Sequence, residues 1–430
     1  MAEKETLNML STSVSRFAQE IEWEIKEGNY LPAIGIGLSG VGKTMAIGEM
    51  AHKLGIGYKE LRLVTLTETD MLGSPLQTKA DGTVLSITEQ ANADFVKTTY
   101  ASNDLLPIIE RDGEEGILVL DEITSASAPV RAAAFQLLDS SRRLGNYKLP
   151  DKWKIVALGN GPDDGGVFAG LESAFLSRNG GTCYRIEYDL KSWKRWATEH
   201  NVHEAITAFL SFDQDSFYQL YEDSIASVFP CPRSWTALST KIKAREKMFG
   251  KLLTEEQVIF YAAGAVGVKV ASKFGGFYRY MHEIAGKVDA EDIVSGKAVT
   301  EVGSAPSRKF KCDALEGLAH EAVYVAIESV SKVLKDMSKD PAGNEFDEDT
   351  VVKPEAKQFF MGVANVMKWA LALADKRMDW AISVIQEIQN NVPAANCAAM
   401  SNEFDEVLPE YAAFAVANRA SFMTGGRRNG

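Results

Sequence analysis

The chain has 430 residues, with 59 acidic and 46 Lys or Arg side chains, so its formal net charge is −13 at pH 7. This length favours two to four domains. The charge argues against wholesale binding to nucleic acid or anionic membranes, although a local basic patch stays open. The four cysteines lie far apart without a C-x-x-C pair, which favours reduced thiols over disulfides or a zinc site. They are Cys183, Cys231, Cys312 and Cys397.

The first residues, Met1 to Ser15, are polar and charged and lack the apolar core of a signal peptide. No run of about eighteen apolar residues follows, so a membrane span is not expected. These features predict a soluble, cytoplasmic protein. Residues 1–30 predict an amphipathic helix, because apolar side chains recur at helical spacing. These are Val14, Phe17, Ile21 and Ile25.

Four apolar stretches predict strands, and helical patterns separate most of them, which is typical of βαβ units in a parallel sheet. The rhythm breaks between Asp70 and Pro107. There Gly73, Pro75 and a Thr/Ser/Asn-rich stretch predict a hairpin or an extended loop. The predicted strands are residues 33–38, 61–66, 116–120 and 154–158.

Beyond Tyr188 the patterns are helical. The run Thr254 to Gln257 is typical of a capping box that opens a helix over residues 258–274. Residues 339–353, with Pro, Gly and an acidic cluster, predict an exposed loop. Further helices are predicted near residues 315–333, 355–373, 376–390 and 403–418, and the Gly/Arg-rich end at 421–430 is predicted to be disordered.

Residues 37–44 read G-x-x-x-x-G-K-T, between a predicted strand and a helical run, Met45 to Leu54. In a phosphate-binding loop of this pattern, backbone N–H groups surround the phosphates, the lysine reaches the β- and γ-phosphates, and the threonine hydroxyl ligates Mg²⁺. A Gly-rich turn before a helix is the alternative, and the flanking strand and helix disfavour it. The candidate ATP-binding residues here are Gly37, Ser39, Gly40, Val41, Gly42, Lys43 and Thr44.

Two carboxylates, Asp121 and Glu122, follow the apolar run 117–120, at the end of a strand where parallel sheets place ligands. Asp121 is the candidate to hold Mg²⁺ together with Thr44. Glu122 is the candidate general base that polarises an attacking water. The alternative is a buried strand ending in solvated acids, which the position downstream of the phosphate loop disfavours.

Another apolar strand, over residues 155–160, ends in Asn160, whose amide could orient the lytic water or contact the γ-phosphate. The sequence Gly-Asn-Gly is equally a turn signal. Residues 171–178 predict a helix that ends in Arg178, a candidate arginine finger that neutralises transition-state charge. A surface arginine near a helix end is the commoner explanation for such a residue.

The order of these motifs, followed by a helical region containing Pro232-Arg233-Ser234-Trp235, resembles the AAA+ ATPases and more narrowly their MoxR-type branch. The narrower resemblance depends on residues 142–150, 193–197, 229–235, 264–274 and 290–293, and it is strong over 31–300 and thinner beyond. It implies an α/β P-loop AAA+ domain over 1–188 with a helix-2 insertion at about 71–106. An all-α lid over 189–300 and a helical C-terminal domain over 301–420 would follow.

By position, the resemblance implies that Asn160 is sensor 1, that Arg178 acts on a neighbouring subunit's nucleotide, and that Arg233 is sensor 2 on the lid. Two residues depart from the family pattern. Ser39 stands where the loop usually has proline, and Asn179 stands where an aromatic residue usually follows the finger.

Arg142 or Arg143 is a second candidate for acting in trans, with a surface charge on a hairpin as the alternative. The insertion is a candidate for contacting clients in the pore of a ring. The resemblance therefore implies an ATP-hydrolysing remodelling machine or chaperone that forms a homo-oligomeric ring, with a hexamer as the expected assembly and a von Willebrand factor A domain protein as the expected partner. A nucleotide-gated binding module with little turnover and a DNA-directed motor are the alternatives, and the acidic charge disfavours the motor.

Other residues are interpreted as structural. His200 and His203 lie three apart without an H-E-x-x-H frame, so no metal site is expected there. The acidic cluster at 345–349 is interpreted as a solvated loop, with partner docking as the alternative. Five tryptophans are interpreted as packing anchors: Trp193, Trp196, Trp235, Trp369 and Trp380.

Overall fold

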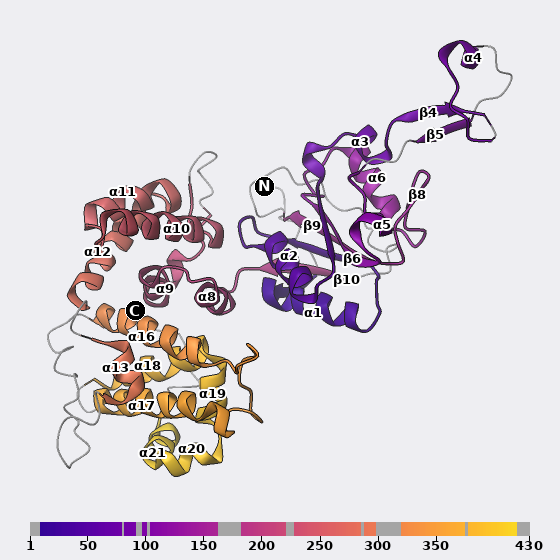
Figure 1. The fold of residues 1–430 in the computed structure, drawn as a ribbon. Coiled ribbons are helices and arrows are strands. Elements are labelled where there is room, and N and C mark those ends of the chain that lie inside the picture. The colour runs from indigo at the N-terminus through magenta and orange to yellow at the C-terminus, as the bar shows by residue number, and fades with distance from the viewer. Residues whose placement is uncertain are drawn as a thin grey trace. The chain divides into compact units, whose positions relative to one another are not determined.

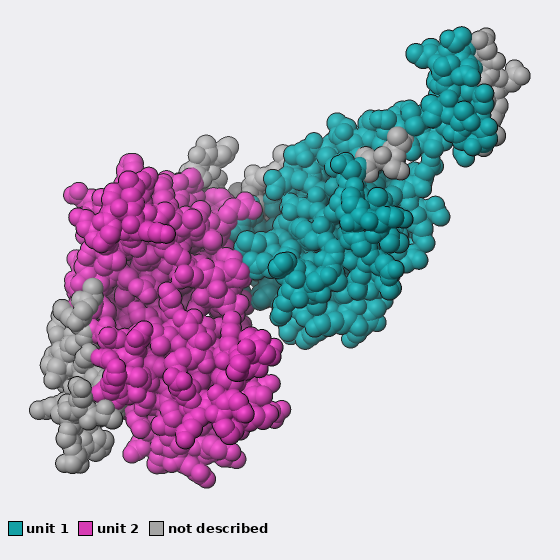
Figure 2. Space-filling view, viewed as in Figure 1, with its two compact units in different colours: residues 1–189 teal, residues 190–430 magenta. Residues whose placement is uncertain are grey.

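The computed structural model divides the chain into two compact units, Met1–Asp189 and Leu190–Gly430, which Figure 2 colours separately. The first unit is built around a sheet and the second is helical (Figure 1). The predicted division of the helical part at residue 300 stays a prediction, and the predicted tail at 421–430 lies outside the described residues. The structure describes residues 9–79, 81–91, 97–100, 104–161, 182–220, 228–284, 288–297, 320–374 and 377–418.

The first unit contains a six-stranded parallel sheet, so the predicted α/β fold is confirmed. The strand order places the strand that ends in Asn160 between the strand of the phosphate loop and the strand of the two acids. The order is β1 (Leu10–Ser13), β10 (Thr182–Glu187), β2 (Ala33–Gly37), β9 (Lys152–Asn160), β6 (Glu115–Asp121) and β3 (Gly57–Arg62). The helices of this unit are α1 (Val14–Lys26), α2 (Lys43–Leu54), α3 (Glu68–Leu72), α4 (Ile87–Ala91), α5 (Ile109–Asp112) and α6 (Ala128–Leu138).

Two predictions near the edges of this sheet were wrong. The strand predicted at 61–66 lies four residues earlier, and Leu63–Thr65 form a short 3-10 turn instead. In β3, at the edge of the sheet, exposed residues alternate with buried or partly buried ones, so the apolar pattern of this strand is weak. The N-terminal helix starts only at Val14, where the Ser13 side chain accepts from the Arg16 amide, and residues 10–13 form β1.

Two hairpins accompany the sheet. The predicted hairpin between 70 and 107 is confirmed as antiparallel β4 (Pro75–Thr78) and β5 (Lys97–Tyr100), which stand with α4 away from the sheet in Figure 1. The second hairpin pairs β7 (Arg143–Leu144) with β8 (Tyr147–Lys148).

The two candidate arginines of the second hairpin differ in their surroundings. The Arg142 guanidinium donates to the carbonyls of Pro150, at 3.2 Å, Asp151, at 2.9 Å, and Trp153, and burial lowers its pKa. The Arg143 side chain is exposed. Arg142 therefore braces the base of the hairpin, and Arg143 is the better placed of the two to meet another molecule.

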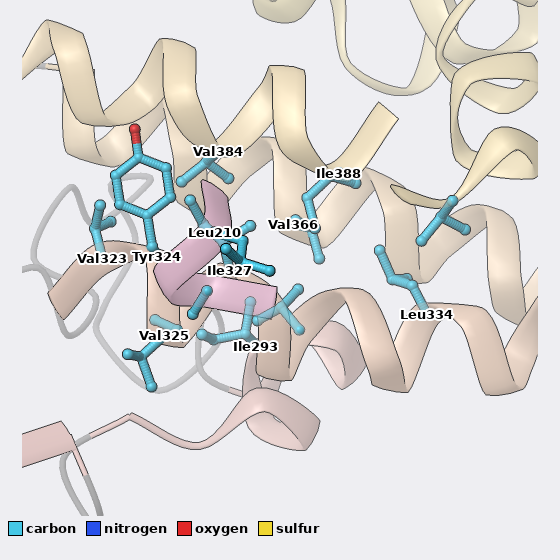
Figure 3. Close-up of a cluster of buried hydrophobic side chains, with 14 of the residues drawn as sticks. Leu210, Ile293, Val323, Tyr324, Val325, Ile327, Leu334, Val366, Val384 and Ile388 are labelled. Atoms are coloured by element: carbon cyan, nitrogen blue, oxygen red, sulfur yellow. The ribbon is translucent and has the colours of Figure 1, made fainter. Parts of the chain in front are cut away.

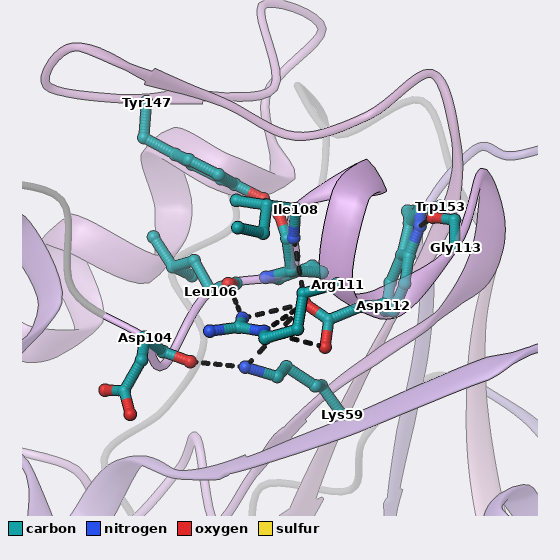
Figure 4. A network of polar contacts seen from close by, with 10 residues as sticks. Lys59, Asp104, Leu106, Ile108, Arg111, Asp112, Gly113, Tyr147 and Trp153 are labelled. Atoms are coloured by element: carbon teal, nitrogen blue, oxygen red, sulfur yellow. Dashed lines mark hydrogen bonds and ion pairs between the residues drawn. The ribbon is translucent and has the colours of Figure 1, made fainter.

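A polar network joins the segment after the insertion to β3 and β9 (Figure 4). The Arg111 guanidinium donates to the Asp112 carboxylate at 2.7 Å, which lowers the pKa of Asp112. The Lys59 ammonium of β3 lies 3.9 Å from the same carboxylate. The Trp153 indole of β9 donates to the Gly113 carbonyl at 3.0 Å. These contacts fix the entry into β6, and so the strand that carries the two acids.

One large hydrophobic core runs through the second unit, from Trp193 to Tyr411, and Figure 3 shows part of it around Ile327 and Val384. Trp235 and Trp369 are almost completely buried in this core, as packing anchors should be. The helices are α8 (Leu190–Glu199), α9 (Glu204–Phe212), α10 (Pro232–Phe249), α11 (Glu255–Val266), α12 (Val268–Ile284), α13 (Ala290–Ser295), α16 (His320–Met337), α17 (Lys357–Ala374), α18 (Met378–Asn391), α19 (Pro393–Ala399), α20 (Asn402–Val407) and α21 (Pro409–Ala417).

The predicted capping box is confirmed, because Thr254 and Gln257 exchange side-chain to backbone hydrogen bonds. The helix it opens ends at Val266, since Gly267 takes a φ of 84°, and α12 begins anew. The pattern at 403–418 likewise gives two helices, separated at Pro409. The helices predicted at 355–373 and 376–390 are confirmed as α17 and α18.

A buried ion cluster links four helices of this unit. The Lys194 ammonium of α8 lies 2.9 Å from Glu328 of α16 and 2.5 Å from Glu387 of α18, and it also donates to Ser211 of α9. Asn391 donates to Glu328 at 3.3 Å. Burial alone would lower the pKa of Lys194, but the two carboxylates outweigh it and raise that pKa above its ordinary value. Lys194 is therefore charged at neutral pH.

The described residues contain no helix that combines the length and the apolar character needed to cross a bilayer. The three cysteines in the described ranges, Cys183, Cys231 and Cys397, are free thiols.

Candidate functional site

The phosphate loop joins the fully buried strand β2 to helix α2. Gly42 caps α2 with a φ of 94°, and Gly40 has a φ of 74°. Residues with a Cβ rarely adopt this left-handed region, so the pattern needs glycine at these positions. The turn directs the start of a 12-residue helix toward the end of the sheet. The backbone N–H groups at such an N-terminus suit an anionic ligand.

Lys43 is 8% exposed and joins the loop to β9. Its ammonium donates to the carbonyls of Gly37 and Leu38, at 3.0 and 2.8 Å, and to the Asn160 side-chain oxygen at 3.1 Å. Gly37 and Asn160 are directly opposite each other in the β2–β9 ladder. The structure therefore brings together two residues that are 117 positions apart in the sequence.

Thr44 lies beside Asp121. Its hydroxyl donates to one Asp121 carboxylate oxygen at 2.8 Å, while the other oxygen accepts from the Glu122 amide, also at 2.8 Å. Asp121 is 8% exposed at the end of β6. Two hard oxygen donors in contact are the ligand chemistry that Mg²⁺ prefers, so the predicted pair fits this ion.

Glu122 follows the strand with an unusual backbone. Its φ is 58°, a left-handed conformation that costs about 1–3 kcal/mol for a residue other than glycine. Two hydrogen bonds support this conformation. The Glu122 amide donates to the Asp121 carboxylate, and the Ser125 amide donates to the Glu122 carbonyl at 3.0 Å. The side chain is partly exposed, so a substrate water can reach it.

One buried polar residue at this site, Thr124, was not predicted from the sequence. Its hydroxyl lies 3.0 Å from both the backbone nitrogen and the backbone oxygen of Asn160. A threonine in the turn after the two acids was visible in the sequence. Its partner was not, because the contact depends on β6 and β9 being neighbours in the sheet.

Two predicted site residues are not tested by the described structure. Arg178 lies outside the described residues, as does Asn179. Arg233 lies in the first turn of α10, in the second unit, where its side chain is exposed. Their predicted roles therefore stay predictions. Ser39, the first of the two departures from the family pattern, is partly buried in the loop.

His203 has a structural role in the second unit. One of its ring nitrogens caps α9 by accepting from the Ala205 amide, and the other lies 2.9 Å from Glu246. No group of three or more His, Cys, Asp or Glu that could hold a metal ion occurs within the described ranges. Both ring nitrogens of His203 therefore have structural contacts.

The family model of the AAA domain, dynein-related subfamily, matches residues 34–178, a range that begins in β2 and contains the phosphate loop, the two acids and Asn160. No curated protein sequence matches the chain.

Solved structures are similar at low identity. The Holliday junction branch migration motor RuvB of Thermotoga maritima is 14% identical, with a TM-score of 0.31, over 78% of this chain and 91% of RuvB. NtrX of Brucella abortus, in complex with ATP, is 14% identical, with a TM-score of 0.32, over 66% of this chain and 64% of NtrX. Similarities this weak carry no argument, so the interpretation of residues 34–178 depends on the family model and the motifs.

Proposed function

We propose that residues 34–178, which match the family model of the AAA domain, dynein-related subfamily, belong to a domain that hydrolyses ATP with Mg²⁺. The observation that carries the proposal is the pair of contacts at the sheet end, Thr44 with Asp121 and Lys43 with Asn160. They join the phosphate loop to Asp121 and Asn160, which supports a role in Mg²⁺ binding for Asp121 and a role as polar sensor for Asn160. Glu122, beside Asp121, would supply the carboxylate that acts as general base during turnover.

In this mechanism, the N–H groups at the start of α2 and the Lys43 ammonium bind the phosphates. Glu122 accepts a proton from a water whose oxygen bonds to the terminal phosphorus, while the bond from that phosphorus to the ADP oxygen breaks. Asn160 orients the water or the terminal phosphate. Each of these groups acts at a place that the strand ends of β2, β6 and β9 already define.

Mg²⁺ would be held by Thr44 and Asp121, and when bound it neutralises charge on the phosphate oxygens. The hydroxyl and the carboxylate are 2.8 Å apart, and the carboxylate is largely buried. Removing magnesium with a chelator should therefore abolish turnover.

We further propose, on the motif resemblance, that the chain acts as a MoxR-type remodelling ATPase in a homo-oligomeric ring, with six subunits as the expected number. Arg178 of one subunit would act on the nucleotide of the next, and Arg233 would couple the nucleotide to the helical unit. The β4–β5 hairpin region, at about 71–106, would contact a protein client. A protein with a von Willebrand factor A domain is the expected partner, and the cytoplasm is the expected location.

The hairpin itself supports the client proposal. A two-stranded hairpin has little stability in water by itself, so contact with a partner would stabilise it. Its connecting segment exposes two apolar side chains, Val84 at 56% and Ile87 at 86%. Single exposed apolar residues are common, so the pair gains meaning only from lying together on this hairpin.

The test of assembly is the ATPase rate per chain across a dilution series, for the native chain and for Arg178→Ala. Ring assembly predicts that the rate per chain falls on dilution and that the variant loses about 10³-fold in turnover at high concentration. Arg16→Ala is the matched control, because Arg16 is exposed on α1 and pairs with Glu20 at 2.8 Å. A rate per chain that neither dilution nor Arg178→Ala changes would contradict the trans-acting arginine. A native chain that binds ATP without turnover would support the nucleotide-gated module instead.

A further inference from the structure

Thr124 is the buried connection between the turn that carries Glu122 and the strand that carries Asn160. Its side chain is fully buried, and its hydroxyl bonds to both the amide nitrogen and the carbonyl oxygen of Asn160, at 3.0 Å each. The two residues are 36 positions apart in the sequence. The Thr124 side chain therefore makes the two hydrogen bonds to the Asn160 backbone that a neighbouring strand would normally make.

Thr124 can bond to the Asn160 backbone because of the way the β6–β9 ladder ends. Regular pairing stops at Leu120 opposite Ala157. The left-handed Glu122 then turns the chain out of the strand, so the backbone can no longer pair in register. The Ile123 amide donates to the Leu158 carbonyl at 3.0 Å. The Thr124 hydroxyl then forms hydrogen bonds with the backbone amide and carbonyl of Asn160, further along β9.

The packing around this hydroxyl is tight. A Cβ on Gly159 would lie 2.7 Å from the Thr124 methyl carbon and 2.8 Å from its hydroxyl oxygen. Only glycine lets the side chain approach the β9 backbone this closely. Thr124 and Gly159 together therefore fix the distance between the turn and the tip of β9.

We propose that Thr124 is a positioning residue of the ATPase site. Its hydroxyl fixes the position of the tip of β9 relative to Glu122. It thereby also fixes the positions of the Asn160 side-chain amide and of the Lys43 ammonium that donates to it. The last link is the 3.1 Å bond from Lys43 to the Asn160 side chain. The proposal rests on the proposed ATPase function for its catalytic consequence. Its structural half, the hold on Asn160, is independent of turnover.

The test compares Thr124→Val, which keeps the shape and removes the hydroxyl, with Thr124→Ser, which keeps the hydroxyl. In Thr124→Val, kcat for ATP should fall by about ten- to a hundredfold while KM stays within about threefold, because a displaced catalytic group affects the reaction more than substrate capture. Thr124→Ser should keep kcat within about threefold of the native value. Thr207→Val is the matched control, because Thr207 is also buried but lies in α9 of the second unit.

Amide hydrogen exchange provides a readout that needs no turnover. The Asn160 amide should exchange about tenfold faster or more in Thr124→Val, and as slowly as in the native chain in Thr124→Ser. Gly159→Ala, whose methyl group would push Thr124 aside, should reproduce both effects and gives a second variant if Thr124→Val does not fold.

The outcomes separate this proposal from the proposed function. Native-like kcat and native-like exchange in folded Thr124→Val would overturn it, and so would a Thr124→Ser variant as impaired as Thr124→Val. If the native chain shows no turnover, the ATPase proposal fails. The exchange measurement then still decides whether Thr124 holds the tip of β9.

Discussion

The buried cluster around Lys194 gives a stability prediction whose size follows from burial. Lys194→Met removes the ammonium and leaves Glu328 and Glu387 beside each other, with side-chain exposures of only 4% and 19%. Breaking a buried ion pair by removing one partner costs about 3–5 kcal/mol, because the remaining charge has lost its compensation. For a unit of this size, this corresponds to a fall of roughly 6–20 °C in the melting temperature.

Tryptophan fluorescence during thermal and urea unfolding measures this change. Five of the seven tryptophans lie in the second unit, so the signal reports mainly on the unit that contains the cluster. Lys332→Met is the matched control, because Lys332 is exposed on the same helix as Glu328, and it should change stability by less than about 0.5 kcal/mol.

A second variant tests the electrostatic reasoning itself. Lys194→Met combined with Glu328→Gln should be more stable than Lys194→Met alone, since a neutral amide still accepts from Ser211 and Asn391. A Lys194→Met variant within about 1 kcal/mol of the native chain would refute the claim that the ammonium compensates two buried carboxylates.

Three further predictions concern other parts of the chain. Burial alone would raise the pKa of Glu246, but hydrogen bonds from its neighbours outweigh it and hold the pKa below the ordinary 4.5. The resulting stability is present above that value and lost as pH falls through the lower folded-state pKa, so Glu246→Gln should flatten an acid-unfolding curve below about pH 5. Gly116→Ala should lower the free energy of unfolding in urea by about 1–3 kcal/mol, because its methyl group would lie 2.6 Å from the Trp153 ring. Gly276→Ala, in open space on α12, should raise the free energy of unfolding by about 0.5–1 kcal/mol. Equal effects of the two substitutions would contradict the packing argument. Thr44→Val should reduce magnesium-dependent ATP turnover about tenfold to a hundredfold, through loss of the hydroxyl beside Asp121, and undiminished turnover would exclude that role.

The sequence predicted the centre of the sheet better than its edges. Buried strands such as β2, β6 and β9 read as apolar runs, so their ends, and the placement of Asp121 and Asn160, followed from the pattern. Strand β3 has alternating exposure at the sheet edge, and the apolar run beside it was mistaken for the strand.

Helix breaks and long-range contacts were harder to predict. Gly267 ends a helix through its backbone angle, a choice that the apolar spacing on both sides does not encode. The contact between Thr124 and Asn160 depends on which strands are neighbours, and that order emerges only from the assembled sheet. Each motif residue could thus be predicted from the sequence, but the contacts between these residues could not.

The most direct test of the central claim is ATP turnover by the native chain and by Glu122→Gln, measured with Mg²⁺ at a concentration that favours assembly. Loss of the general base should lower kcat by about 10²–10⁴-fold. ATP binding should persist in the variant, because the Lys43 and Thr44 contacts at the sheet end remain. A Glu122→Gln variant that hydrolyses ATP at the native rate would contradict the assignment of the site.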